Sequence, residues 1–239
     1  MLQLLRSRRW IGFTLLVLVV IVGFGLLSRW QWHRAEEKRT QEAAIEAATR
    51  ATPLTVAAAA TPTEWQPVSV TGVYDPASQV VVRKRPLDAT NGFWVLTPLR
   101  LPDDTVVWVN RGWIPAEGAA TEMPAIPAPP SGTVTVRGWW RDFEPGDVDT
   151  SGLPVGMVPQ PASAYLPMAG DFSGYVQRIE STPNDPEPIA IPRDVLDDSR
   201  NVSYSVQWIL FAIVAVVGWF IFLRREARED REMRTNHDA

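Results

Sequence analysis

The sequence predicts a membrane protein of the α+β class, in which two transmembrane helices flank an extracytoplasmic antiparallel β-rich domain, barrel- or sandwich-like. Three observations lead to this prediction. The segments Trp10–Ser28 and Tyr204–Leu223 are apolar runs without a charged residue. Each is about as long as a helix needs to cross a bilayer core of about 30 Å. Between them, short β-branched segments alternate with proline and glycine, which is typical of strands and turns.

The first apolar run follows a short basic segment, residues 1–9, which contains Arg6, Arg8 and Arg9. This arrangement also fits a signal peptide. The run is long for a signal peptide, however, and it is followed by Arg29–Arg34 (RWQWHR) instead of small residues at a cleavage site. We therefore expect residues 10–28 to stay in the protein as an anchor.

The second apolar run, residues 204–223, has aromatic residues at both ends, as an interfacial belt requires, and Arg224-Arg225 follows it directly. Two spans place both termini on one side of the membrane. Long domains translocate largely regardless of charge. We therefore expect a multi-pass protein of the plasma membrane, with residues 1–9 and the charged tail 224–239 in the cytoplasm.

An interfacial helix or stalk is predicted for residues 29–63. Its charged, alanine-rich part, Ala35–Arg50, should continue the first helix out of the membrane, and Pro53 should end it because proline cannot continue a helix. Its apolar stripe is thin, which favours a solvated stalk.

The β-rich domain is predicted over residues 64–200. A turn at Pro102-Asp103-Asp104 indicates a hairpin, and two proline-rich stretches interrupt the strands: Glu122–Pro130, an extended linker, and Asp149–Gly170, with a short helix near Pro161–Met168. The expected strands are Glu64–Asp75, Gln79–Arg85, Phe93–Arg100, Thr105–Ile114, Thr133–Trp140 and Gly174–Glu180.

Composition excludes several classes of function. The sequence has no cysteine and only two histidines, His33 and His237, so disulfides, thiol chemistry and a His/Cys metal site are not expected. A net charge of -4 without a basic stripe outside the membrane flanks argues against nucleic acid. Acidic pairs such as Asp103-Asp104 lack an organised second group, so we expect no catalytic residues.

Several motifs, taken in their order along the chain, resemble those of the SURF1 family of cytochrome c oxidase biogenesis proteins. The most specific is Val109–Pro115 (VNRGWIP), and the resemblance covers most of the chain. The other matching segments are Trp30-Gln31 with Arg34 and Lys38, Thr71–Tyr74 (TGVY) followed by Arg83 and Arg85, Gly92–Leu99 (GFWVLTPL), Val136–Gly138 with Arg141, and Asn201–Trp208 (NVSYSVQW).

The resemblance implies an assembly factor for a haem-copper cytochrome c oxidase, a chaperone of the respiratory chain that aids haem a insertion into the core subunit. Its implied partners are the membrane, that core subunit and proteins of haem a synthesis, and its implied cofactor is at most a transient haem a. Members of the family often carry a histidine just before Tyr204. This chain has Asn201 there, and an amide is a poor axial ligand compared with imidazole.

Three residues are candidates for contact with the cofactor: His33 as a transient haem ligand, Trp30 as a stacking partner, and Arg111 as a partner of a propionate. The alternatives are an interfacial anchor for His33 and Trp30, and a structural turn around Arg111. Gln207 is expected to hydrogen-bond to the first span or to a partner subunit. The residues expected to contact a partner or to support the motifs are Gln31, Arg34, Asn110, Gly112, Trp113, Tyr204, Gln207 and Trp208.

Other functions stay open at this point. The chain could be a structural accessory subunit of the oxidase or of a respiratory supercomplex. An enzyme acting outside the membrane is disfavoured by the scarcity of histidine and the lack of organised carboxylates. A ligand sensor is disfavoured because the short C-terminal tail offers no output domain.

Overall fold

The computed structural model describes residues 6–57, 59–118, 121–168 and 170–237. It divides the chain into two units, one formed by Met1–Ala43 with Val195–Ala239 and the other by Ala44–Asp194. Residues 1–5 of the predicted N-terminal segment and residues 238–239 of the predicted tail lie outside the described residues.

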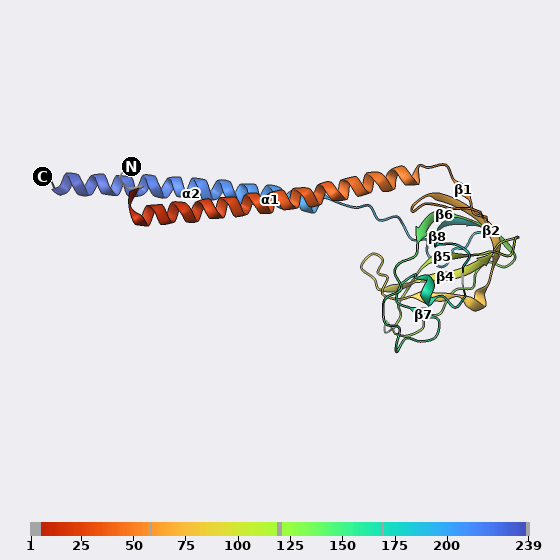
Figure 1. Cartoon of the computed structure of the whole chain (residues 1–239). Coiled ribbons are helices and arrows are strands. Elements are labelled where there is room, and N and C mark those ends of the chain that lie inside the picture. The colour runs from red at the N-terminus through yellow and green to blue at the C-terminus, as the bar shows by residue number, and fades with distance from the viewer. Residues whose placement is uncertain (1–5, 58, 119–120, 169, 238–239) are drawn as a thin grey trace. The chain divides into compact units, whose positions relative to one another are not determined.

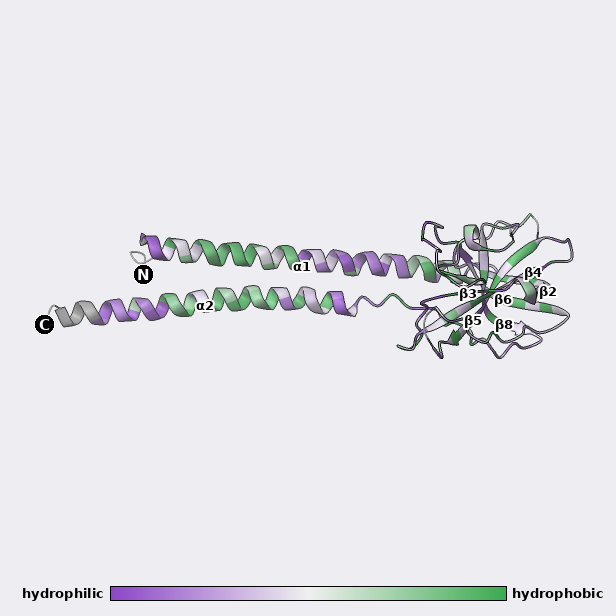
Figure 2. Cartoon of the chain, turned by 90° about the horizontal axis from the view of Figure 1, so that it is seen from below, coloured by the Kyte–Doolittle hydropathy of each residue, from purple (hydrophilic) through white to green (hydrophobic). Residues whose placement is uncertain are grey.

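Two long helices carry the apolar runs. Helix α1 spans Arg8–Thr49 and helix α2 spans Ser199–His237, and both are long and apolar enough to cross a membrane. Figure 2 shows the hydrophobic residues concentrated in the first half of α1 and in the middle of α2. Helix α1 continues without a break through the charged, alanine-rich segment, and it ends before Pro53 as expected.

The two helices pack side by side along one stripe of each (Figure 1). The buried and half-buried positions of this stripe, called covered positions here, follow one another at alternating steps of four and three residues. This mean period of 3.5 residues keeps one face of a helix against its partner over many turns. On α1 the covered positions include Trp10, Thr14, Val17, Ile21, Phe24, Ser28, Gln31, Ala35, Lys38 and Glu42; on α2 they include Asn201, Ser205, Trp208, Ala212, Ala215 and Trp219.

Polar contacts join the helices along this stripe. The hydroxyls of Ser28 and Ser205 lie 2.9 Å apart, and each also donates to the other's carbonyl oxygen, at 3.0 and 3.1 Å. The Trp219 indole donates to the Thr14 hydroxyl at 3.1 Å. In lipid there is little hydrophobic drive for helix association, so close packing and such hydrogen bonds hold spans together.

The second unit is a barrel-like sheet (Figure 1). All six predicted strands are confirmed, with shifts of a few residues at their ends. Two short strands and one 3-10 turn were not predicted from the sequence. A second 3-10 turn, η3, lies where a short helix was expected, near Pro161–Met168. The strands are β1 (Leu54–Thr55), β2 (Pro67–Tyr74), β3 (Val80–Val82), β4 (Gly92–Arg100), β5 (Val106–Pro115), β6 (Thr133–Asp142), β7 (Met157–Val158) and β8 (Gly174–Thr182), and the turns are η2 (Pro76–Ser78) and η3 (Ser163–Tyr165).

Closure of the sheet follows from its strand order. The sheet runs β1-β2-β6-β8-β5-β4-β3-β7, and β2 also pairs with β4, so β2, β6, β8, β5 and β4 form a ring. Most pairs are antiparallel as predicted, but β1–β2, β3–β7 and β5–β8 are parallel. The parallel pair β5–β8 brings together strands that are far apart in the sequence, which local patterns do not reveal.

Alternation along the strands produces the barrel core. In β6 the side chains of Val134, Val136 and Trp140 point inward, and exposed or half-buried residues lie between them. Strand β5 differs, because every residue from Val106 to Ile114 is buried. One of its faces lines the interior, and the other packs under β3, β7 and the following loop.

The absence of natural cysteines allows a direct test of the helix pairing. We expect Ser28→Cys combined with Ser205→Cys to form a disulfide on mild oxidation, since the two hydroxyls are 2.9 Å apart. Protection of most thiols from a maleimide–polyethylene glycol reagent would report the bond. The control is Ser28→Cys with Ser203→Cys, because the Ser203 hydroxyl is exposed and bonds its own helix at Ser199. Equal labelling of the two double variants would contradict the pairing.

Candidate functional site

The cluster at the end of the first apolar run is divided between two faces of α1. Trp30, His33 and Arg34 are exposed, with 60% of Trp30 accessible. The Arg29 Nε donates to the His33 Nε2 at 3.4 Å, and Arg34 pairs with Glu37 at 3.0 Å. Positions 30, 33, 34 and 37 repeat with a helical period, so these side chains share one outward face.

Gln31 belongs to the opposite face, which contacts α2. Its Oε1 accepts a hydrogen bond from the Asn201 amide at 2.9 Å. Asn201 therefore fastens the two helices to each other. Trp208 stacks on Phe24, with ring centroids 5.6 Å apart. Tyr204 and Gln207 are exposed, whereas their neighbours Asn201 and Ser205 make polar contacts to α1.

The segment just before α2, residues 196–198, is fastened to α1 by contacts that the sequence did not suggest. Lys38 donates to the Asp197 carbonyl at 2.9 Å, Arg39 pairs with Asp198 at 2.6 Å, and the Leu196 N–H donates to Glu42 at 3.0 Å. Lys38, Arg39 and Glu42 lie about three to four turns beyond the apolar run, which ends at Ser28. They therefore continue the helix pairing outside the apolar segments.

A carboxylate cap begins α2. The backbone N–H and the hydroxyl of Ser199 both donate to the Asp197 carboxylate, at 2.9 and 2.7 Å. These two hydrogen bonds lower the pKa of Asp197 below its ordinary value. A negative charge just before a helix also interacts favourably with its N-terminal dipole.

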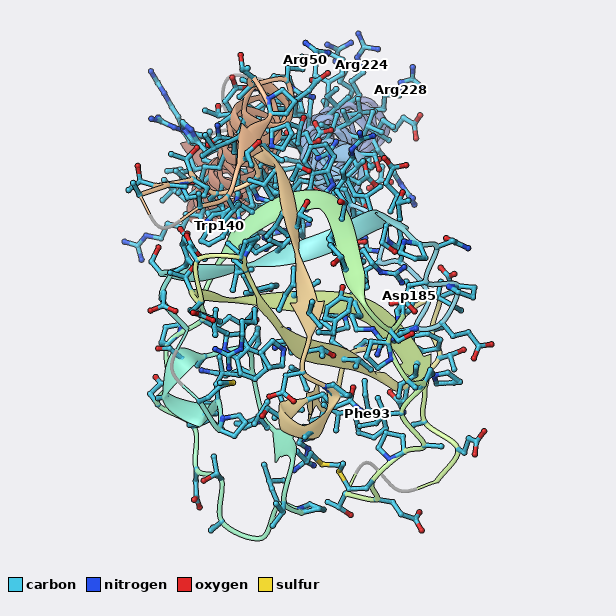
Figure 3. All side chains as sticks on the ribbon, turned by 90° about the vertical axis from the view of Figure 1, so that its right-hand side faces the viewer. Arg50, Phe93, Trp140, Asp185, Arg224 and Arg228 are labelled. Carbon is cyan, nitrogen blue, oxygen red and sulfur yellow. The ribbon has the colours of Figure 1, made fainter. Side chains whose placement is uncertain are left out.

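In the β domain, Arg111 of β5 lies at the end of the barrel interior and is completely buried. Its Nε and Nη2 bind the Asp185 carboxylate at 2.8 and 3.0 Å, in the two-point geometry that suits a guanidinium. Its remaining donors reach the carbonyl oxygens of Pro127, Ala128 and Glu187 at 2.8 to 3.2 Å. Figure 3 marks Asp185 within the domain.

A second buried arginine, Arg178 of β8, completes this cluster. Its Nε donates to the Arg111 carbonyl at 2.5 Å, and its other nitrogens donate to the carbonyls of Asp185 and Pro188. Burial lowers the pKa of Arg178. Two guanidiniums share one carboxylate here, so carbonyl dipoles supply the rest of the stabilisation.

The neighbours of Arg111 in the Val109–Pro115 motif hold the same returning segment. The Gly112 N–H donates to Asn110 Oδ1 at 3.1 Å, and the Trp113 and Ile189 backbones exchange hydrogen bonds of 2.8 and 2.9 Å. Gly112 has φ +142°, and a Cβ there would lie 2.2 Å from the Ile189 carbonyl oxygen. Only glycine allows this approach.

These contacts give the motif a structural role. Arg111 and Trp113 fasten the segment 185–189 to β5, Asn110 holds the Gly112 backbone, and the Trp113 indole also donates to the Arg85 carbonyl at 2.7 Å. A ligand carboxylate could reach Arg111 only by displacing Asp185. We therefore propose that Arg111 acts by positioning this segment and not by touching a cofactor.

A groove of about 540 Å³ opens beside the fastened segment. It is lined mainly by apolar side chains, among them Trp113, Ile126 and Ile189, with the carboxylates of Glu117 and Glu187 at its margin. In the part of the chain that the structure describes, no group of three or more His, Asp or Glu side chains could hold a metal ion.

Comparison with known proteins agrees with the motifs. A family model described as the SURF1 family matches residues 18–213, which run from α1 through the barrel into α2. Uncharacterized SURF1-like proteins of Mycobacterium bovis and Mycobacterium tuberculosis are each 31% identical to the chain over 179 residues. That match covers 70% of this chain and 63% of each relative, so it includes less than two thirds of the relatives' length.

Removing one partner of the buried pair should destabilise the domain strongly. We expect Arg111→Ala to lower the free energy of unfolding by about 3–5 kcal/mol, since it leaves Asp185 charged and buried. Denaturant unfolding of the full chain in detergent, followed by tryptophan fluorescence, measures this. The matched control is Arg137→Ala, whose pair with Glu180 is exposed and should contribute less than about 1 kcal/mol. Similar losses in both variants would contradict the assignment.

Tyr74 offers a pH-dependent test of the same core. Burial raises the pKa of its hydroxyl well above the ordinary value, and the hydroxyl has no hydrogen-bond partner among the described residues. Unfolded tyrosine ionises near pH 10, so stability should fall as the pH rises beyond about 10, because the unfolded state releases its proton first. We expect Tyr74→Phe to reduce this alkaline loss, and to leave stability at pH 7 unchanged or slightly higher.

The control for Tyr74→Phe is Tyr165→Phe. The Tyr165 hydroxyl donates to the Val148 carbonyl at 2.8 Å and accepts from the Val148 N–H at 2.7 Å. Its removal should cost about 1 kcal/mol at pH 7. If Tyr74→Phe lowered the free energy of unfolding at pH 7 more than Tyr165→Phe, the Tyr74 hydroxyl would have a hydrogen-bond partner in the folded protein, which would contradict this assignment.

Proposed function

The chain belongs to the SURF1 family, and from this premise we propose that it is an assembly factor for a haem-copper cytochrome c oxidase. The proposed step is the entry of haem a into the core subunit. The observation that carries the proposal is the extent of the family match, which runs from within α1 through the barrel into α2. The SURF1 family is an assembly-factor family and is not known for enzymatic activity.

The division of α1 into two faces supports a chaperone role. One face is used for pairing with α2, through Ser28, Gln31 and Ala35. The other leaves Trp30, His33 and Arg34 accessible at the end of the apolar run. We propose that the paired helices dock beside the core subunit in the membrane and that this outward face contacts the haem-loading intermediate.

The residues of this face fit haem a only as a transient contact. Haem a needs an axial donor, and imidazole is a suitable one. His33 is exposed and could supply it, with Arg29 and Arg34 nearby for propionates and Trp30 for stacking. On α2 the amide of Asn201 is already bonded to Gln31, so a second axial ligand from that position is not part of the proposal.

The barrel contributes a surface in this proposal. The buried cluster of Arg111, Arg178 and Asp185 fixes the segment 185–189, which forms one wall of the groove beside Trp113. Such a fixed wall favours docking of an oxidase subunit or of a protein of haem a synthesis, because little ordering is needed on binding. We further propose that the barrel lies outside the cytoplasm and that the helices lie in the plasma membrane.

Deletion of the gene tests the proposal. We expect a sharp fall in the haem a content of the membranes and in oxidase activity, restored by the wild-type gene. Complementation with His33→Ala should restore less haem a than complementation with Arg137→Ala, an exposed residue of the barrel. Unchanged haem a and oxidase activity after deletion would refute the assembly role.

The deletion strain, complemented with a tagged chain, distinguishes an assembly factor from an accessory subunit. A tagged chain acting transiently should be recovered with purified mature oxidase far below one copy per enzyme, and mainly with partly assembled core subunit. Recovery at one copy per mature oxidase would show instead that the chain is a permanent subunit.

A further inference from the structure

One end of the helix pair carries arginines that are free of carboxylate partners. Near this end Arg9 pairs with Glu226 at 3.1 Å, and Arg225 pairs with Glu229 at 3.0 Å. Arg224 and Arg228 of α2 have no such partner in the described stretches of the chain, and both are exposed. Figure 3 shows both side chains extending outward.

Arg224 and Arg228 are placed to act together. They are four residues apart on one helix, so they lie one above the other on the same face. The Arg224 guanidinium carbon lies 4.2 Å from the centre of the Phe220 ring, which holds this side chain against the helix. A hollow of about 410 Å³ lies here, lined by Ile221, Arg224, Arg228 and their charged neighbours Arg225, Glu229 and Glu232.

The position of this hollow along α2 indicates which molecules can reach it. Arg224 is the first charged residue after the apolar run Tyr204–Leu223. Residues at such a boundary lie where the hydrocarbon core meets the lipid headgroups. Ile221 and Phe220 lie one turn back, in the apolar segment, so the hollow combines an apolar side with two cations.

We propose that Arg224 and Arg228 form a binding site for the phosphate of an anionic phospholipid, such as phosphatidylglycerol. The planar guanidinium matches phosphate geometry with two hydrogen bonds, and an acyl chain would lie against Ile221. Basic residues next to a span attract anionic lipids. Glu229 is held by Arg225, and Glu232 can accept a hydrogen bond from a headgroup hydroxyl. The proposal does not depend on the function proposed above.

Native mass spectrometry of the purified full-length chain in detergent tests this site. The chain is titrated with phosphatidylglycerol and, separately, with phosphatidylcholine of the same acyl chains. We expect the wild type to prefer phosphatidylglycerol, and Arg224→Gln with Arg228→Gln to lower its affinity for that lipid by about tenfold or more. Phosphatidylcholine binding should not change. Both replaced residues are exposed, so circular dichroism should show the same helix content.

The matched control removes the same charge from two exposed arginines of the barrel, Arg100→Gln with Arg137→Gln, and should keep the affinity for phosphatidylglycerol. An equal loss in this control would overturn the proposal, since the effect would then reflect total charge. Wild-type affinity in the Arg224 and Arg228 variant would also overturn it. Displacement of the lipid by millimolar inorganic phosphate would identify a site for free phosphate instead.

Discussion

The buried pair of Arg111 and Asp185 is the constraint on which the barrel domain depends. A guanidinium without solvent is tolerated only when a charge partner and hydrogen-bond acceptors surround it. Asp185 supplies two bonds, and carbonyls of Pro127, Ala128 and Glu187 supply the others. Two segments distant in sequence, 127–128 and 185–187, must therefore meet at β5, and Gly112 allows the chain just after the second to approach closely.

The helix pair solves a different physical problem. Lipid tails are as apolar as the side chains of the spans, so the hydrophobic effect does not drive the helices together. Close packing and polar contacts therefore determine how the spans associate. The bonds of Ser28 to Ser205 and of Gln31 to Asn201 set the register of one helix against the other. The same register turns Trp30, His33 and Arg34 away from the pair and leaves them available to a partner.

The buried ion pair and the helix pairing both bear on the role of this SURF1 family member. The motif around Arg111, which suggested a carboxylate-binding site, is used to build a fixed wall beside an apolar groove. The accessible polar and aromatic groups of the predicted site are those on α1. At the barrel site, by contrast, the guanidiniums of Arg111 and Arg178 are already bonded to Asp185 and to backbone carbonyl oxygens.

The sequence by itself determined both spans, the stalk helix and the six main strands, because apolar run length and residue alternation are local properties. Only the tertiary structure decided how the motif residues are used. Nothing near Arg111 in sequence indicates Asp185, 74 residues away, and no local pattern indicates that Asn201 bonds to Gln31 in particular. The parallel pair β5–β8 and the closing pair β2–β4 likewise depend on contacts between distant segments. A residue's local pattern sets its secondary structure, whereas its partners are set by the fold that buries it.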